Sequence, residues 1–185
     1  GSFLGASTRW LLDNSSEWNA KITAIDPNLR HRIFDSPRSV LEKLNSKFIP
    51  NRLDVVTAFF GKPFHPYYAD YNTYLPHRPR EFVDALFKSR PVISGDFDKK
   101  FDFIFIDGDH SYEATMENFC VALQLLNPEG VIAFHDVYSW PGVEQAMNTI
   151  IEQCRTIGDV VLWGQEMRNN PEFGFFDGIF HFKLR

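Results

Sequence analysis

The second half of the chain alternates short apolar runs with stretches of helical periodicity. The run at 101–106 is nearly continuously apolar, which is typical of a parallel strand covered on both faces. One helix is expected to end at the breaker residues 127–130, and a second to begin at Pro141 and end at Gly158. The apolar stripe of the first helix consists of Met116, Phe119, Cys120, Leu123 and Leu126. Strands are predicted at 101–106, 131–134, 160–163 and 178–182.

The first half shows the same alternation more weakly. Helices are expected at 6–13, 36–47 and 81–89, and strands at 21–25 and 53–59. Between them, residues 61–80 are rich in proline and tyrosine, which predicts a long aromatic loop. Such a loop can serve as a lid or as a binding loop. The alternative is a loop that only packs on the protein surface or contacts a partner. Strands alternating with helices predict an α/β fold with a doubly wound, Rossmann-like, mostly parallel sheet.

Composition limits the classes of partner. The 185 residues suit a single domain over 1–185, and the net charge of −5 disfavours a nucleic acid or an anionic membrane as the main partner. No apolar run reaches the length of about 20 residues needed to span a bilayer. Cys120 and Cys154 both fall on apolar helix faces, which predicts buried thiols and a reducing, cytoplasmic setting.

Carboxylates follow two successive strands of the second half, and this regularity is the main functional signal. Asp107-Gly108-Asp109-His110 follows the strand at 101–106, and His135-Asp136 follows the strand at 131–134. Neighbouring parallel strands lie about 4.8 Å apart, so these side chains would meet at one sheet edge and share a Mg²⁺, Mn²⁺ or Fe²⁺ ion. The alternative for each motif is a turn or helix cap in which the carboxylate binds backbone amides.

The stretch from Phe101 to Glu113, followed by Asn127–Asp136 and Pro141-Gly142-Val143, resembles the class I S-adenosylmethionine (SAM)-dependent methyltransferases. More narrowly, it resembles their small metal-dependent O-methyltransferases of the macrolide-sugar and cephamycin pathways. The resemblance implies a sheet with a final antiparallel strand. It also implies that the opening residues, Gly1 to Thr8, form the family's glycine loop, with the strand before it absent from this sequence.

The same resemblance assigns roles to individual residues. His110 would be the general base, and Asp107, His135 and Asp136 would hold the metal, with Asp107 also at the cofactor. SAM would contact the glycine loop, a carboxylate that binds its ribose hydroxyls, and a residue beside its adenine ring. The residues in these three places are Gly1, Ser2, Gly5, Ser7 and Thr8, then Asp26, then Asp96.

The expected substrate is a small molecule with a hydroxyl acceptor. The aromatic loop and Trp140 would stack on a flat or glycosylated acceptor, or they would form contacts of a homodimer. Two other functions fit the same motifs. One is a methyltransferase-like module that binds cofactor or partner without catalysis, and the other is a metal-dependent phosphoesterase that uses Asp107-Gly108-Asp109-His110.

Overall fold

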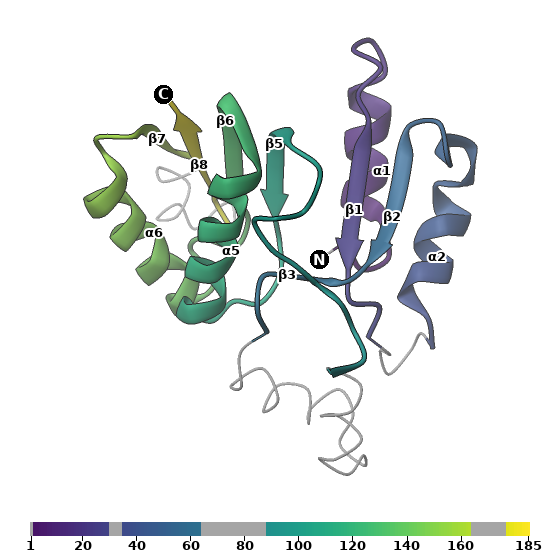
Figure 1. Cartoon of the computed structure of the whole chain (residues 1–185), viewed down its shortest axis with the longest axis horizontal. Coiled ribbons are helices and arrows are strands. Elements are labelled where there is room, and N and C mark those ends of the chain that lie inside the picture. Colours follow the sequence, from purple (N-terminus) through teal and green to yellow (C-terminus); the bar gives the residue numbers. More distant parts are fainter. Residues whose placement is uncertain (1, 30–34, 64–87, 164–176) are drawn as a thin grey trace, which may run out of the picture. The chain divides into compact units, whose positions relative to one another are not determined.

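The computed structural model describes residues 2–29, 35–63, 88–163 and 177–185 (Figure 1). The chain divides into two compact units, Gly1–Val92 and Ile93–Arg185. Most of the predicted aromatic loop and of the predicted helix at 81–89 lies outside the described residues. In the described part of the chain, no helix is long and apolar enough to cross a membrane.

The first unit is built on one pair of parallel strands. Strand β1 runs alongside β2, with Ile22 opposite Leu53 and Asp26 opposite Thr57. The Ser36 side chain accepts a hydrogen bond from the Ser39 amide and so caps the helix that connects the two strands. The core cluster of this unit is Leu12, Ala24, Leu41 and Leu53. Its elements are α1 (Ala6–Asn14), β1 (Ile22–Asp26), α2 (Pro37–Leu44), a 3₁₀ turn (Ser46–Phe48), β2 (Leu53–Thr57) and β3 (Phe59–Phe60).

The second unit contains a four-stranded sheet in the order β5-β6-β8-β7. Strand β5 is parallel to β6, whereas β8 is antiparallel to both of its neighbours. This arrangement confirms the α/β class and the final antiparallel strand. Helices α5 and α6 lie side by side in Figure 1. The elements are β4 (Val92–Ile93) at the unit boundary, β5 (Phe101–Ile106), α5 (Tyr112–Leu125), β6 (Leu126–Phe134), α6 (Pro141–Cys154), β7 (Gly158–Trp163) and β8 (Ile179–Leu184).

The core of the second unit explains part of the chain's high phenylalanine content. The rings of Phe119 and Phe182 meet edge to face, with centroids 5.3 Å apart and an interplanar angle of 89°. Phe134 and Phe180 meet in the same way at 6.1 Å. All four side chains are almost completely buried. Such edge-to-face contacts add to the free energy gained from burying the rings, so they fix helix α5 against β6 and β8.

Several expectations about local structure are wrong. Strand β6 begins at Leu126 rather than at 131, directly after α5 and through the expected breaker residues. Gly158 starts β7 instead of ending α6. Of the predicted stripe only Phe119 and Leu126 are buried, and Leu126 belongs to β6. Other residues of α5 make up the rest of its buried surface, because the helix packs against both the sheet and α6. These other buried residues are Ala114, Thr115, Asn118, Val121, Ala122 and Leu125.

Two expectations of burial also fail. Strand β5 buries Ile104 and Ile106, but Phe103 is 48% exposed, so the described residues do not cover this strand completely on both faces. Cys120 is exposed and Cys154 is half-buried, and both are free thiols. Partial burial still raises the pKa of each thiol above its ordinary value.

We expect Phe182→Ala to lower the free energy of unfolding by about 3–5 kcal/mol, because it leaves a cavity beside Phe119. Urea unfolding followed by circular dichroism measures this change. Val161→Ala is the matched control, because Val161 lies on the neighbouring strand and the residue is 38% exposed. Equal effects of the two substitutions would contradict the assigned core.

Candidate active site

The first unit carries the predicted glycine loop as a tight turn before α1. The Gly5 amide donates to the Ser2 carbonyl at 2.7 Å, and Gly5 has a φ of 83°. A Cβ at this position would lie 2.7 Å from Leu41 Cγ, so both the conformation and the space require glycine. Ser7 is exposed and Thr8 is buried, whereas Gly1 lies outside the described residues.

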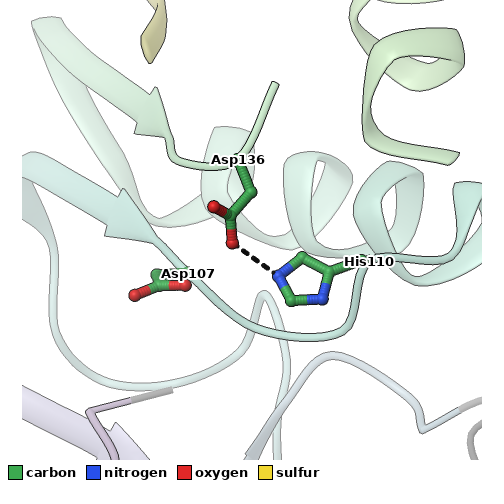
Figure 2. A group of neighbouring side chains, drawn as sticks. All are labelled: Asp107, His110 and Asp136. Atoms are coloured by element: carbon green, nitrogen blue, oxygen red, sulfur yellow. Dashed lines mark hydrogen bonds and ion pairs between the residues drawn. The ribbon is translucent and has the colours of Figure 1, made fainter. Parts of the chain in front are cut away.

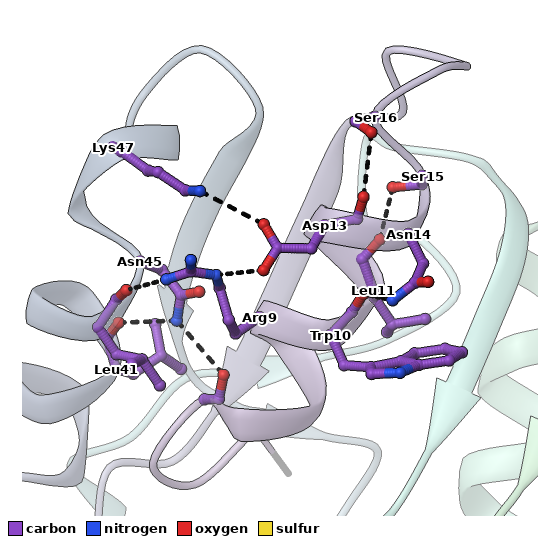
Figure 3. Close-up of polar contacts among 12 residues, drawn as sticks. Arg9, Trp10, Leu11, Asp13, Asn14, Ser15, Ser16, Leu41, Asn45 and Lys47 are labelled. Atoms are coloured by element: carbon purple, nitrogen blue, oxygen red, sulfur yellow. Dashed lines mark hydrogen bonds and ion pairs between the residues drawn. The ribbon is translucent and has the colours of Figure 1, made fainter.

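A buried amide and a charged network hold this turn against α2 (Figure 3). Asn45 is fully buried, and its Nδ2 donates to the carbonyls of Leu41 and Gly5 at 2.9 and 3.4 Å. Arg9 donates to the Leu44 carbonyl and to Asp13, and this second bond holds the pKa of the Asp13 carboxyl below its ordinary value. The end of α2 therefore fixes the position of the glycine turn.

Asp26 ends β1, as the sequence predicts, and its carboxylate organises two turns. One oxygen accepts a hydrogen bond from the Phe3 amide at 2.8 Å, and the other accepts from the Asn28 amide at 2.7 Å. Phe3 and Asn28 both have positive φ, a backbone conformation that is unfavourable for residues other than glycine. The Asp26 carboxylate therefore stabilises two unfavourable backbone conformations. Each carboxylate oxygen has a further lone pair, which keeps Asp26 chemically able to accept from ribose hydroxyls.

In the second unit, Asp107, His110 and Asp136 lie close together. Strands β5 and β6 pair with Ile106 opposite Phe134, so the residues that follow them share one edge of the sheet. Figure 2 shows Asp107 just after β5, His110 on the loop that continues from it, and Asp136 just after β6. One ligand atom from each of these three half-buried side chains lies within 4.8 Å of the other two.

A close contact in this group joins His110 to Asp136. His110 Nε2 lies 2.8 Å from Asp136 Oδ2. A carboxylate accepts hydrogen bonds, so in the neutral imidazole this contact favours the tautomer with its proton on Nε2. The Nδ1 atom then carries the lone pair that can accept a proton. Such a histidine–carboxylate pair has the chemical form of an oriented general base.

A second group includes Asp136 and Asp177, a residue that the sequence pattern did not indicate. His135, Asp136 and Asp177 also place one ligand atom each within 4.8 Å of one another. The predicted metal ligands Asp107 and His135 therefore fall into different groups that share Asp136. His135 Nδ1 is buried 2.9 Å from Asp136 Oδ1, but it forms no hydrogen bond among the described residues.

Asp177 escaped prediction because it precedes a strand instead of following one. Strand β8 runs antiparallel to β6, so its beginning lies at the edge where β5 and β6 end. The Asp177 carboxylate accepts a hydrogen bond from the Ser139 hydroxyl, and its backbone carbonyl accepts from the Tyr138 amide. A carboxylate just before a suspected antiparallel strand was the signal that could have identified it.

Asp96, the predicted adenine-side residue, is exposed on the loop after β4. The Ser94 hydroxyl donates to its carboxylate, and this hydrogen bond holds the pKa of the Asp96 carboxyl below its ordinary value. Asp96 is therefore a charged acceptor near neutral pH, as hydrogen bonding to an adenine amino group or a ribose hydroxyl requires.

Comparison with family models identifies the family of the chain. The family model Methyltransf_24, described as a methyltransferase domain, matches residues 1–137. The chain belongs to this methyltransferase family. It has the class I fold, and the enzyme is a SAM-dependent methyltransferase, as the resemblance implied. No curated protein matches the methyltransferase.

Solved structures share the fold of the methyltransferase at low sequence identity. An rRNA methylase from Streptococcus thermophilus has a TM-score of 0.58 at 9% identity, covering 100% of this chain and 82% of its own. The O-methyltransferase TomG from Streptomyces achromogenes, in complex with SAM, has a TM-score of 0.55 at 16% identity, with coverages of 100% and 70%. An O-methyltransferase from Bacillus cereus, in complex with SAH, has a TM-score of 0.51 at 15% identity, with coverages of 98% and 81%.

We expect Asp26→Asn to lower the free energy of unfolding of the methyltransferase by about 1–3 kcal/mol. The amide that replaces the carboxylate has one accepting oxygen, so the Phe3 or the Asn28 amide loses its partner. Urea unfolding measures the change, and Glu17→Gln, on an exposed residue of the same unit, is the control. Indistinguishable unfolding midpoints would show that the carboxylate does not hold the two turns.

Proposed function

We propose that this methyltransferase transfers the methyl group of SAM to a hydroxyl oxygen of a small molecule, with His110 as the base and a divalent metal at Asp136. The observation that carries the proposal is the convergence of Asp107, His110 and Asp136 at the end of two parallel strands. This arrangement places a proton acceptor beside oxygen atoms that suit a hard cation.

The reaction needs little from the protein beyond position and proton removal. The acceptor oxygen forms a bond to the methyl carbon, the carbon–sulfur bond breaks, and its electron pair stays on the sulfur of S-adenosylhomocysteine. The hydroxyl proton moves to His110 Nδ1 while Asp136 holds the opposite nitrogen. A histidine fixed in this way removes the proton as the new bond forms, so no free alkoxide is needed.

The donor atoms fit a divalent cation such as Mg²⁺, Mn²⁺ or Fe²⁺. Asp136 offers carboxylate oxygens to both ligand groups, and Asp107 adds a carboxylate on the His110 side. In the other group, His135 offers a buried Nδ1 that lacks a hydrogen-bond partner among the described residues. Asp177 adds a further carboxylate on the His135 side of the site. When bound, the cation would lower the pKa of an acceptor hydroxyl and orient it.

Charge supports a small molecule rather than a nucleic acid as the acceptor. The chain has 24 acidic side chains against 19 basic ones, a balance that repels a phosphate backbone. SAM would be held by the residues predicted for it, among which Gly5 and Asp26 have the conformation and the acceptor atoms that this role requires.

We expect His110→Gln to lower kcat by roughly 10²- to 10⁴-fold and to leave the Kd for SAM within threefold, because it removes proton transfer alone. The assay follows transfer of radiolabelled methyl from SAM, with Mn²⁺ present, to a panel of catechols, phenols and hydroxylated sugars. His181→Gln, on β8, is the matched control. Unchanged kcat in the His110 variant, or SAM binding without transfer to any member of the panel, would contradict the proposal.

We expect Asp136→Asn to abolish Mn²⁺ binding, because both candidate ligand groups contain Asp136. Isothermal titration calorimetry and electron paramagnetic resonance of Mn²⁺ measure binding without an acceptor. Asp109→Asn is the control, because Asp109 accepts a hydrogen bond from the Ser111 amide and an asparagine oxygen can still accept it. Retained Mn²⁺ affinity in the Asp136 variant would remove the metal from the mechanism.

A further inference from the structure

Trp140 lies directly before α6 and stacks on the imidazole of His110. The two ring centroids are 4.6 Å apart and the ring planes differ by 4°. The indole is still 47% exposed, so the contact does not result from burial of the tryptophan in the core. The indole face that was expected to stack on a flat acceptor is therefore in contact with the candidate base.

Two different contacts now restrain the His110 ring. Asp136 holds it in the ring plane through Nε2, at 2.8 Å. A single hydrogen bond still allows the ring to swing about the line that joins donor and acceptor. A parallel aromatic face opposes that swing, because tilting the imidazole would separate the stacked surfaces or drive them together. In combination, the two contacts fix the direction in which Nδ1 points.

The backbone around Trp140 is itself held close to the His110 loop. A Cβ on Gly142 would lie 2.4 Å from the His110 carbonyl oxygen and 2.8 Å from the Tyr112 amide nitrogen. Only a glycine permits this approach of the first turn of α6 to the loop. Pro141 occupies the first turn of the same helix, where its fixed φ suits the helical conformation. The indole and the imidazole therefore extend from two backbone segments in direct contact.

We propose that Trp140 is a positioning residue that holds the His110 imidazole in the orientation in which Nε2 bonds Asp136 and Nδ1 faces the reaction. The inference rests on the proposed role of His110 as base. This role explains Trp140 without any contact between its indole and the substrate. It also predicts that an aromatic ring at position 140, rather than tryptophan in particular, is the requirement.

Nitrogen-15 NMR of histidine-labelled protein tests the positioning directly, since the two ring nitrogens of His110 report its tautomer. We expect well-separated Nε2 and Nδ1 shifts in the native chain, partial averaging in Trp140→Ala, and near-native shifts in Trp140→Phe. His110→Gln assigns the signals. Identical His110 shifts in the native chain and in Trp140→Ala would overturn the proposal, and averaging in Trp140→Phe as complete as in Trp140→Ala would do so too.

The chain offers a matched control in a second tryptophan–histidine pair. Trp163 donates from Nε1 to His181 Nδ1 at 3.1 Å, and their ring centroids are 6.1 Å apart. Trp163→Ala should therefore change the His181 signals and leave those of His110 in place. The amide spectrum of each variant confirms that the chain is folded. Movement of the His110 signals in Trp163→Ala equal to that in Trp140→Ala would show a general loss of structure and overturn the assignment.

Kinetics separate this inference from the proposed function. With the acceptor panel described above, Trp140→Ala should lower kcat by about 10- to 100-fold and leave the KM for SAM within threefold, with rescue by Trp140→Phe. If the native chain neither binds SAM nor transfers methyl groups, the proposed function is contradicted. The NMR spectra would still decide the role of Trp140. Native kcat in Trp140→Ala would overturn the positioning role.

Discussion

The parallel pairing of β5 with β6 is the constraint on which the candidate site depends. Because Ile106 lies opposite Phe134, the two chain segments that leave these strands emerge side by side at one edge. A shift of the register by one residue would turn every side chain of a strand to the other face of the sheet. The aromatic core beneath the sheet, with Phe134 buried against Phe119 and Phe180, opposes such a shift. The register between β5 and β6 therefore determines both the packing of the core and the geometry of the site.

Three contacts fix the position of the His110 imidazole and of the loop that carries it. Asp136 orients the imidazole in its plane, Trp140 lies against its face, and Gly142 brings the start of α6 against the loop that carries it. The first unit shows a comparable design at the glycine turn, where Asn45 and Asp26 bind its backbone. In both units the candidate functional residues sit on tight turns, and neighbouring side chains hold those turns. This is what catalysis by positioning requires, because small displacements of reacting groups slow the reaction strongly.

The sequence was informative where a local signal and a global pattern coincided. Apolar runs that end in carboxylates predicted the meeting of Asp107 with Asp136, since neighbouring parallel strands expose the same ends at one edge. It misled where the helix α5 was expected to bury a single stripe, because a helix packed against both a sheet and another helix buries a wider surface. It also failed to find Asp177, whose place depends on the antiparallel direction of β8.

The sequence by itself determined the α/β class, the methyltransferase family and the residue types available for proton transfer and metal binding. These follow from periodicity, from turn residues and from motifs, all of which are local along the chain. Only the tertiary structure decided that Asp136 bonds Nε2 of His110, that Trp140 stacks on that ring, and that Asp107 and His135 belong to different ligand groups. The reason is physical: rotamers and contacts between distant segments depend on packing in three dimensions, and spacing in the sequence does not specify packing.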